Sequence, residues 1–141
     1  MTTLDFCLRI GTALLAGIII GLERQLSRKT TGLRTNTLVA LGATLYVLLS
    51  LNLTQESGDV TRIIGQVVTG IGFLGAGIIF REGANVHGLT TAATVWCSSA
   101  IGCMAGAGLF LECAIATVVI VAVNLVLMPI DNFLSRRKKL R

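Results

Sequence analysis

The sequence predicts an all-α protein that crosses a membrane with five helices. Of its 141 residues, 53% are hydrophobic and only 13% are charged, whereas charged residues make up about 25% of a soluble domain. An apolar run of about 18 or more residues can span a bilayer as a helix. Five runs are candidates, at residues 4–22, 37–53, 63–80, 89–107 and 109–128. We therefore expect one transmembrane domain over residues 1–141, since these runs leave little sequence for a soluble core.

The basic residues alternate from one link between these runs to the next. Four lie after the first run, one lies after the third, and five lie in a tail that we assign to residues 129–141. Because cytoplasmic loops of membrane proteins are rich in Lys and Arg, this pattern predicts an outer N-terminus and a cytoplasmic C-terminus. We interpret the basic tail as a cytoplasmic segment that ends the last membrane helix and lies next to anionic lipid, rather than as a nucleic-acid-binding segment.

The first run ends in a ladder of small residues at four-residue spacing, Ala13, Gly17 and Gly21. Such a ladder lets the backbone of another helix approach closely. Asp5 and Arg9 have the same spacing, which would let them pair at the outer end of the helix. The run lacks the flanks of a cleaved signal peptide, so we expect it to be retained as a span.

Glu23 and Arg24 follow this run at once, at the expected cytoplasmic boundary. In one interpretation they form a solvated helix end, with long side chains that reach out of the membrane. In the other, Glu23 turns inward and pairs with a cation such as Arg34. The sequence alone leaves both alternatives open.

The second and third runs differ in their small and polar residues. Thr35 or Asn36 is the expected N-cap of the second helix, which otherwise resembles a scaffold. The third run is dense in glycine, with Gly70, Gly72, Gly75 and Gly77 close together along it. At helical spacing these glycines fall on more than one side of the helix, so partners could approach from several directions. We therefore expect the third helix at the centre of the bundle.

The fourth run carries a polar stripe and is joined to the third by the short polar segment 81–88. The stripe consists of Thr90, Thr91, Thr94, Cys97 and Ser98. Its hydroxyls could form hydrogen bonds within their own helix or to a neighbouring helix, and the pattern favours this alternative. In the other alternative they line a polar cleft or a partner-binding face. Trp96 falls on the far side, where it can face lipid, and Gly102-xxx-Gly106 adds a second close-approach ladder.

The fifth run is rich in Val and Ile, and its polar residues are Glu112 near the outer end and Asn124 inside. An intramembrane Asn indicates either a functional site or a hydrogen bond between helices. Pro129 is expected to end this helix.

The residue types give no indication of an enzyme or a metal centre. The four cysteines form no CxxC pair, and the single histidine, His87, has no ligand-like neighbour, so a zinc site is not expected. The sequence also lacks a nucleophile–histidine–carboxylate set and a phosphate-loop motif. We therefore expect no catalysis, no bound metal and no cofactor.

Three sequence blocks carry a family resemblance: GLERQ at 21–25, GLRTN at 32–36 and GIGFLGAGIIFREGANVHGLTTAATVWC at 70–97. In this order and spacing they strongly resemble the MgtC/SapB family of bacterial inner-membrane proteins, and its MgtC branch most closely. The resemblance covers essentially the whole chain and implies five spans in the inner membrane. Longer members carry a C-terminal domain resembling an ACT fold, which a sequence ending in RRKKLR is expected to lack.

The resemblance also implies a role. MgtC-like proteins are linked to growth at low magnesium and to survival of pathogens inside macrophages, and are thought to restrain the F-type ATP synthase. We therefore expect a non-enzymatic regulatory protein whose helices contact a membrane partner such as that synthase. Whether the protein also forms a homo-oligomer is left open. The alternative is a small oligomeric ion transporter or channel whose pathway uses the stripe of the fourth run with Glu23 or Glu82.

The resemblance also implies functional positions. The family's polar signature maps onto Glu23, Arg24, Arg34, Asn36, Arg81, Glu82, Asn85, Thr90, Thr91 and Cys97. Members of the MgtC branch look to carry Asn where this chain has Thr90. Thr94 joins these candidates because it lies in the polar stripe. The candidates for helix packing are Gly17, Gly21, Gly70, Gly72, Gly75, Gly77, Gly102 and Gly106.

Overall fold

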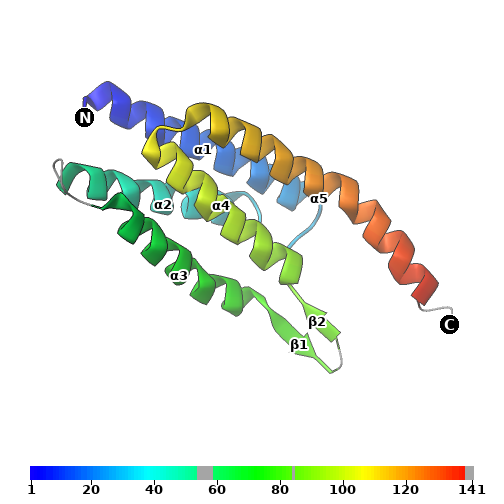
Figure 1. Cartoon of the computed structure of the whole chain (residues 1–141). Coiled ribbons are helices and arrows are strands. Elements are labelled where there is room, and N and C mark those ends of the chain that lie inside the picture. The colour runs from blue at the N-terminus through cyan, green and yellow to red at the C-terminus, as the bar shows by residue number, and fades with distance from the viewer. Residues whose placement is uncertain (54–58, 84, 139–141) are drawn as a thin grey trace.

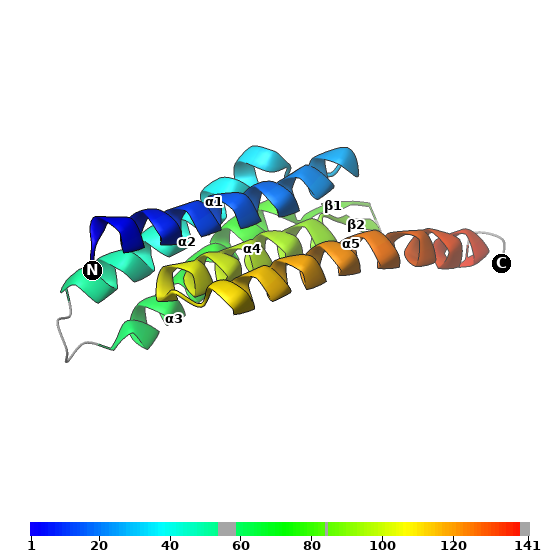
Figure 2. The same cartoon turned by 90° about the horizontal axis from the view of Figure 1, so that it is seen from above.

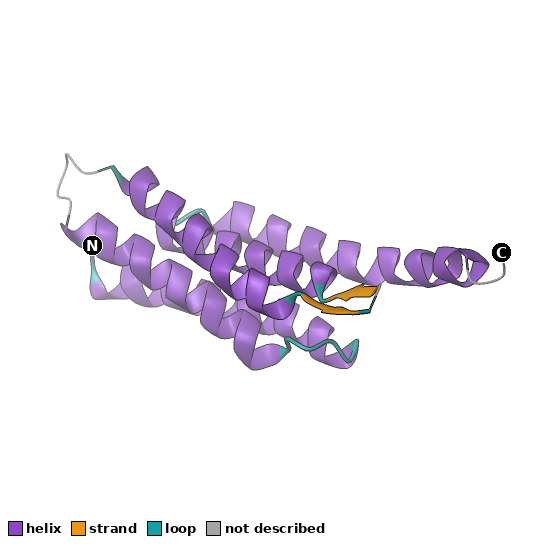
Figure 3. Cartoon of the chain, turned by 90° about the horizontal axis from the view of Figure 1, so that it is seen from below, coloured by secondary structure: helices purple, strands orange, loops and turns teal. Residues whose placement is uncertain are grey.

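The computed structural model describes residues 1–53, 59–83 and 85–138 of the chain. Within these ranges it contains five helices and one short hairpin (Figures 1 and 3). The elements are α1 (Thr3–Leu26), α2 (Leu33–Leu53), α3 (Val60–Ile78), β1 (Phe80–Glu82), β2 (Asn85–His87), α4 (Leu89–Ala107) and α5 (Phe110–Lys138). The predicted all-α class is therefore confirmed.

Several helix ends follow directly from their local sequence. Thr2 caps α1 by accepting a hydrogen bond from the Asp5 backbone at 3.2 Å, and Asp59 caps α3 by accepting one from the Thr61 backbone at 2.9 Å. On α1, Arg9 Nε lies 3.0 Å from Asp5 Oδ1, so the pair that the spacing predicted is present. The expected N-cap of α2 is wrong, because α2 begins at Leu33 and both Thr35 and Asn36 lie inside its first turns.

Four of the described helices are long and apolar enough to cross a membrane: α1, α2, α3 and the part Phe110–Asp131 of α5. The fourth predicted span, α4, forms a helix with the predicted bounds, but it is not among these four helices. Its Thr and Ser side chains lower its hydropathy, and most of them are buried against other helices. The crossing of α4 and the orientation of the bundle stay predictions.

The centre of the bundle is α4, which contacts each of the other four helices (Figure 1). Its two ladder glycines allow this position because α2 runs directly against them. A Cβ atom at Gly102 would lie 2.1 Å from the Ala40 carbonyl oxygen, and one at Gly106 would lie 2.8 Å from the Val47 side chain. The close-approach ladder predicted for the fourth helix is therefore confirmed.

The ladder of α1 makes a second tight contact with α2. A Cβ atom at Gly17 would lie 2.7 Å from Thr37 Cα, and one at Gly21 would lie 2.6 Å from Leu33 Cα. Since backbone atoms on α2 occupy these positions, neither glycine could carry a side chain without separating the helices. Ala13 on the same face is fully buried.

The expectation that the third helix is central is wrong, because α3 lies at the edge of the bundle. Ile71 is its only described buried residue. No atom lies within 4 Å of a Cβ built on Gly70, Gly72 or Gly77, and Gly75 meets only the Ala92 methyl group at 3.9 Å. The glycine density of α3 is thus not explained by contacts among the described residues.

The polar segment after α3 forms a two-stranded antiparallel hairpin at the end of the bundle away from the N-terminus (Figure 3). Gly88 then starts α4 with φ of 86°, and a Cβ there would lie 2.2 Å from the Ile78 carbonyl oxygen. The helices α3 and α4 are antiparallel neighbours, and β1 pairs with β2 from Phe80–His87 to Glu82–Asn85.

The expectation that Pro129 ends the fifth helix is wrong. The helix α5 continues through Pro129 to Lys138, and its C-terminal part projects beyond the other helices (Figure 2). A proline removes only one backbone donor and bends a helix without always ending it. Most of the predicted basic tail therefore continues this helix, while residues 139–141 lie outside the described ranges.

Candidate functional site

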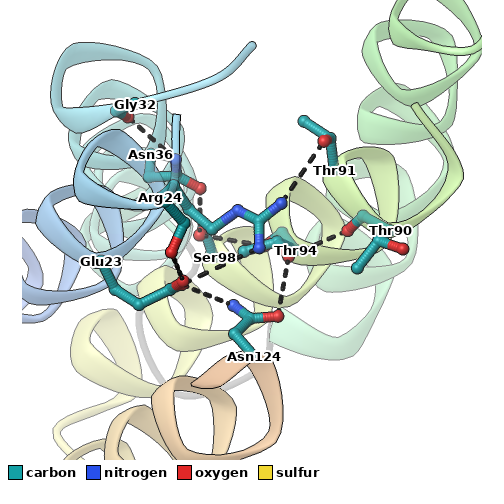
Figure 4. A network of polar contacts seen from close by, with 10 residues as sticks. Glu23, Arg24, Gly32, Asn36, Thr90, Thr91, Thr94, Ser98 and Asn124 are labelled. Atoms are coloured by element: carbon teal, nitrogen blue, oxygen red, sulfur yellow. Dashed lines mark hydrogen bonds and ion pairs between the residues drawn. The ribbon is translucent and has the colours of Figure 1, made fainter. Parts of the chain in front are cut away.

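A polar network joins four helices near the hairpin end of the bundle (Figure 4). The side chains come from α1, α2, α4 and α5, and they include two opposite charges. Its members are Glu23, Arg24, Asn36, Thr91, Thr94, Ser98 and Asn124. Ionisable groups buried in a membrane-spanning bundle are costly and usually functional, so this network is the candidate site.

The two charges of the network are adjacent in sequence on α1. Glu23 is 6% exposed and Arg24 is 1% exposed, and Arg24 Nη1 lies 3.9 Å from Glu23 Oε2. The alternative in which Glu23 turns inward is therefore correct. The cation that it meets is Arg24, and Arg34 is exposed at the start of α2 instead.

The carboxylate of Glu23 has good hydrogen-bond donors besides its charged neighbour. Asn124 Nδ2 on α5 donates to Glu23 Oε2 at 2.9 Å, and Ser27 Oγ donates to Glu23 Oε1 at 2.9 Å. The Asn124 amide oxygen in turn lies 3.5 Å from Thr94 Oγ1 on α4. Asn124 thus forms hydrogen bonds between helices, which is one of the two alternatives that its position inside an apolar run indicated.

A second branch of the network links α2 to α4. Asn36 is fully buried, its Nδ2 donates to the Gly32 carbonyl at 2.9 Å, and its Oδ1 accepts from Ser98 Oγ at 2.9 Å. The Thr94 hydroxyl bonds back to the Thr90 carbonyl at 2.9 Å. The polar stripe of α4 therefore bonds to its own helix and to its neighbours, which is the alternative that the pattern favoured.

The guanidinium of Arg24 has fewer and longer hydrogen bonds than its donors allow. Its Nη2 donates to Thr91 Oγ1 at 3.4 Å, its Nη1 is 3.9 Å from the Glu23 carboxylate, and its Nε has no hydrogen-bond partner. A guanidinium carries five N–H donors, so much of its capacity is unused. A buried cation in this state is costly unless a further acceptor is present.

The other predicted polar positions lie outside this network. Arg34, Arg81, Glu82, Asn85 and the Thr90 side chain are exposed, and Cys97 is half-buried and free. Two members, Ser98 and Asn124, were not among the predicted functional positions. Their signal in the sequence was a polar residue inside an apolar run. In the described residues, no three His, Cys, Asp or Glu side chains lie together as a metal site would require.

A second feature is a cleft of about 990 Å³ between α2 and α3. Apolar side chains and the glycines Gly42 and Gly70 line it, and Arg34 lies at its end. No atom lies within 4 Å of a Cβ built on either glycine. The cleft therefore has room beside one position on each helix that carries no side chain.

Comparisons with known proteins place these features in a family context. The model of a family described as the MgtC family matches residues 10–133. Protein MgtC of Brucella abortus (strain 2308) is 56% identical over 123 residues, which is 87% of this chain and 51% of that protein. Protein MgtC of Salmonella typhimurium (strain LT2) is 47% identical over 127 residues, which is 90% of this chain and 54% of that protein.

A third relative comes from a different group of bacteria. An uncharacterized protein of Synechocystis is 45% identical over 130 residues, which is 92% of this chain and 55% of that protein. The chain thus spans about half the length of the curated relatives it matches. No solved structure matches it.

Proposed function

The chain belongs to the MgtC family, and from this membership we propose that it is a non-enzymatic regulatory protein of the bacterial inner membrane. It acts by binding a helix of a partner membrane protein. The family resemblance suggests adaptation to low magnesium and virulence as its setting and the F-type ATP synthase as its partner. Because the chain spans about half the length of its relatives, the proposal concerns what this membrane domain contributes.

The observation that supports a helix-binding role is the exposure of α3 and of the cleft beside it. A membrane-spanning helix of this chain offers glycine positions with open space, and only Ile71 among its described residues is buried. In lipid there is no hydrophobic force that drives helices together, so small residues that permit close backbone approach dominate helix association. The α2–α3 cleft presents such residues from both sides.

The cleft has the lining that a transmembrane helix of a partner would need. Val39 and Leu74 supply apolar contacts, and Gly42 and Gly70 leave room for a neighbouring backbone. Arg34 and Gln66 offer polar groups along the same cleft. The alternative of a transport pathway along the α4 stripe has no such support, because Thr94 and Ser98 are buried and bonded to other helices.

The test compares two substitutions on α3, Gly70→Leu and Gly72→Leu. Both positions have open space around a built Cβ, but only Gly70 lines the cleft. We expect Gly70→Leu to fill the cleft, abolish copurification of the membrane partner and fail to restore growth at low magnesium. Gly72→Leu should behave as the wild type. Both variants should reach normal abundance in the membrane, as measured by immunoblot.

Equal activity of the Gly70→Leu variant at normal abundance would contradict the cleft as the binding surface. The transporter alternative has its own measurement in liposomes. We expect purified protein to give no Mg²⁺ flux above that of empty vesicles, and a saturable flux would contradict the regulatory proposal.

A further inference from the structure

A second pocket, of about 540 Å³, lies at the hairpin end of the bundle. The end of α1, the loop after it, the strand β2 and the first turn of α4 surround this pocket. It is separate from the α2–α3 cleft, and the only network members that line it are Arg24 and Thr91.

The pocket is strongly basic. Arg24, Arg28 and Lys29 line it, with His87 on the hairpin side, and none of its lining residues carries a carboxylate. Two backbone hydrogen bonds hold the loop that carries Arg28 and Lys29: Lys29 N donates to the Arg24 carbonyl at 3.0 Å, and Arg28 N donates to the Gln25 carbonyl at 3.0 Å. These bonds fix the backbone positions from which the Arg28 and Lys29 side chains reach the pocket.

The unused donors of Arg24 point to a missing acceptor in this region. Arg24 is 1% exposed, its Nε has no hydrogen-bond partner, and its two polar contacts are long, at 3.4 and 3.9 Å. The same side chain lines the pocket. An anion there would supply acceptors for the one buried guanidinium that the network leaves incompletely bonded.

The start of α4 contributes donors to the same pocket. The N-cap of this 19-residue helix is Gly88, which provides no side-chain hydrogen bond. The first N–H groups of a helix have no partner within it and carry the positive end of the helix dipole. The residues at these positions, Leu89, Thr90 and Thr91, line the pocket. Such helix starts are recurrent binding sites for phosphate groups.

We propose that this pocket binds a phosphate group, with Arg24, Arg28 and Lys29 as its cations and the first turn of α4 as its backbone donors. The group belongs either to a free phosphate or to the headgroup of an anionic phospholipid, since the predicted topology would bring this end of the bundle to the cytoplasmic surface of the membrane. This binding is independent of the helix-binding role proposed above.

The test measures two probes against a charge-matched pair of variants. Inorganic phosphate is titrated into lipid-stripped protein in detergent by calorimetry, and phosphatidylglycerol is compared with phosphatidylcholine by native mass spectrometry. The test variant Arg28→Gln/Lys29→Gln changes two exposed side chains of the pocket. The control Arg62→Gln/Arg81→Gln removes the same charge from exposed residues that line neither this pocket nor the α2–α3 cleft.

We expect the test variant to weaken binding of the phosphate-bearing probe by about tenfold or more, since two charge-assisted contacts are lost. The control should change it little. Binding of inorganic phosphate would identify a free anion as the ligand, and selective binding of phosphatidylglycerol alone would identify the headgroup. Binding of neither probe, or equal weakening by the control variant, would overturn the proposal.

Discussion

At the scale of single residues, the adjacent pair Glu23 and Arg24 decides the energetics of the polar network. Each is nearly inaccessible, and each would be expensive to bury without the other. Glu23 has neutral donors from Asn124 and Ser27 as well as its charged neighbour, at 2.9 Å each. Arg24 depends on Glu23 for its charge balance within the described chain. Removal of the carboxylate should therefore damage the protein mainly through Arg24.

Substitution of Glu23 tests this dependence. We expect Glu23→Gln to lower the free energy of unfolding by about 3–5 kcal/mol, because it leaves a buried cation uncompensated. The matched control is Asp5→Asn, which removes the carboxylate of a partly exposed pair on the same helix and should cost about 1 kcal/mol or less. Unfolding in mixed detergent micelles measures both. Similar small losses in both variants would mean that Glu23 does not balance Arg24.

At the scale of elements, the glycines divide the helices into tightly packed and open ones. The ladders of α1 and α4 lie against backbone atoms of α2, whereas the glycines of α3 meet almost nothing in this chain. A glycine in contact permits a helix crossing, while a glycine without contacts only lowers helix stability. The same substitution should therefore have opposite effects on α4 and α3.

The alanine variants Gly102→Ala and Gly72→Ala measure this difference. A methyl group at Gly102 would lie 2.1 Å from the Ala40 carbonyl oxygen, so we expect a loss of about 1–3 kcal/mol from overpacking. At Gly72 no atom lies within 4 Å, and the isolated protein should gain about 0.5–1 kcal/mol. Thermal denaturation in detergent reports both signs. A stabilised Gly102→Ala variant would show that α2 and α4 are not in close contact.

The helices and the ladders could be predicted because their signals are local. Apolar runs define the helices, and spacing places Gly17 with Gly21 and Gly102 with Gly106 on one face. The same spacing argument failed for Gly70 and Gly72, because their contacts depend on which helices meet and not on the helix that carries them. For the same reason, the sequence indicated that Glu23 could turn inward but not that Arg24, rather than Arg34, would be beside it.

At the scale of the whole molecule, the basic residues should orient the bundle. The hairpin and the end of α5 lie away from the N-terminus (Figure 1), and the basic links fall on their side. Reporter fusions after residue 57 and after residue 141 test the orientation, and we expect activity of an outer-side reporter only at residue 57. Alkaline phosphatase and green fluorescent protein are suitable complementary reporters. Signals from the same side at both positions would contradict the predicted topology.

The burial of the α4 hydroxyls also has a consequence for how the protein is made. Because α4 carries Thr and Ser hydroxyls that are buried in the bundle, lipid is a poor solvent for these groups as the helix leaves the ribosome. By then α2 has been synthesised, so Asn36 can already bond Ser98 and Ala40 can pack on Gly102. Asn124 arrives only with α5. We therefore expect the insertion of α4 to depend on helices made earlier, and its hydrogen bond with Asn124 to form only after α5 has been synthesised.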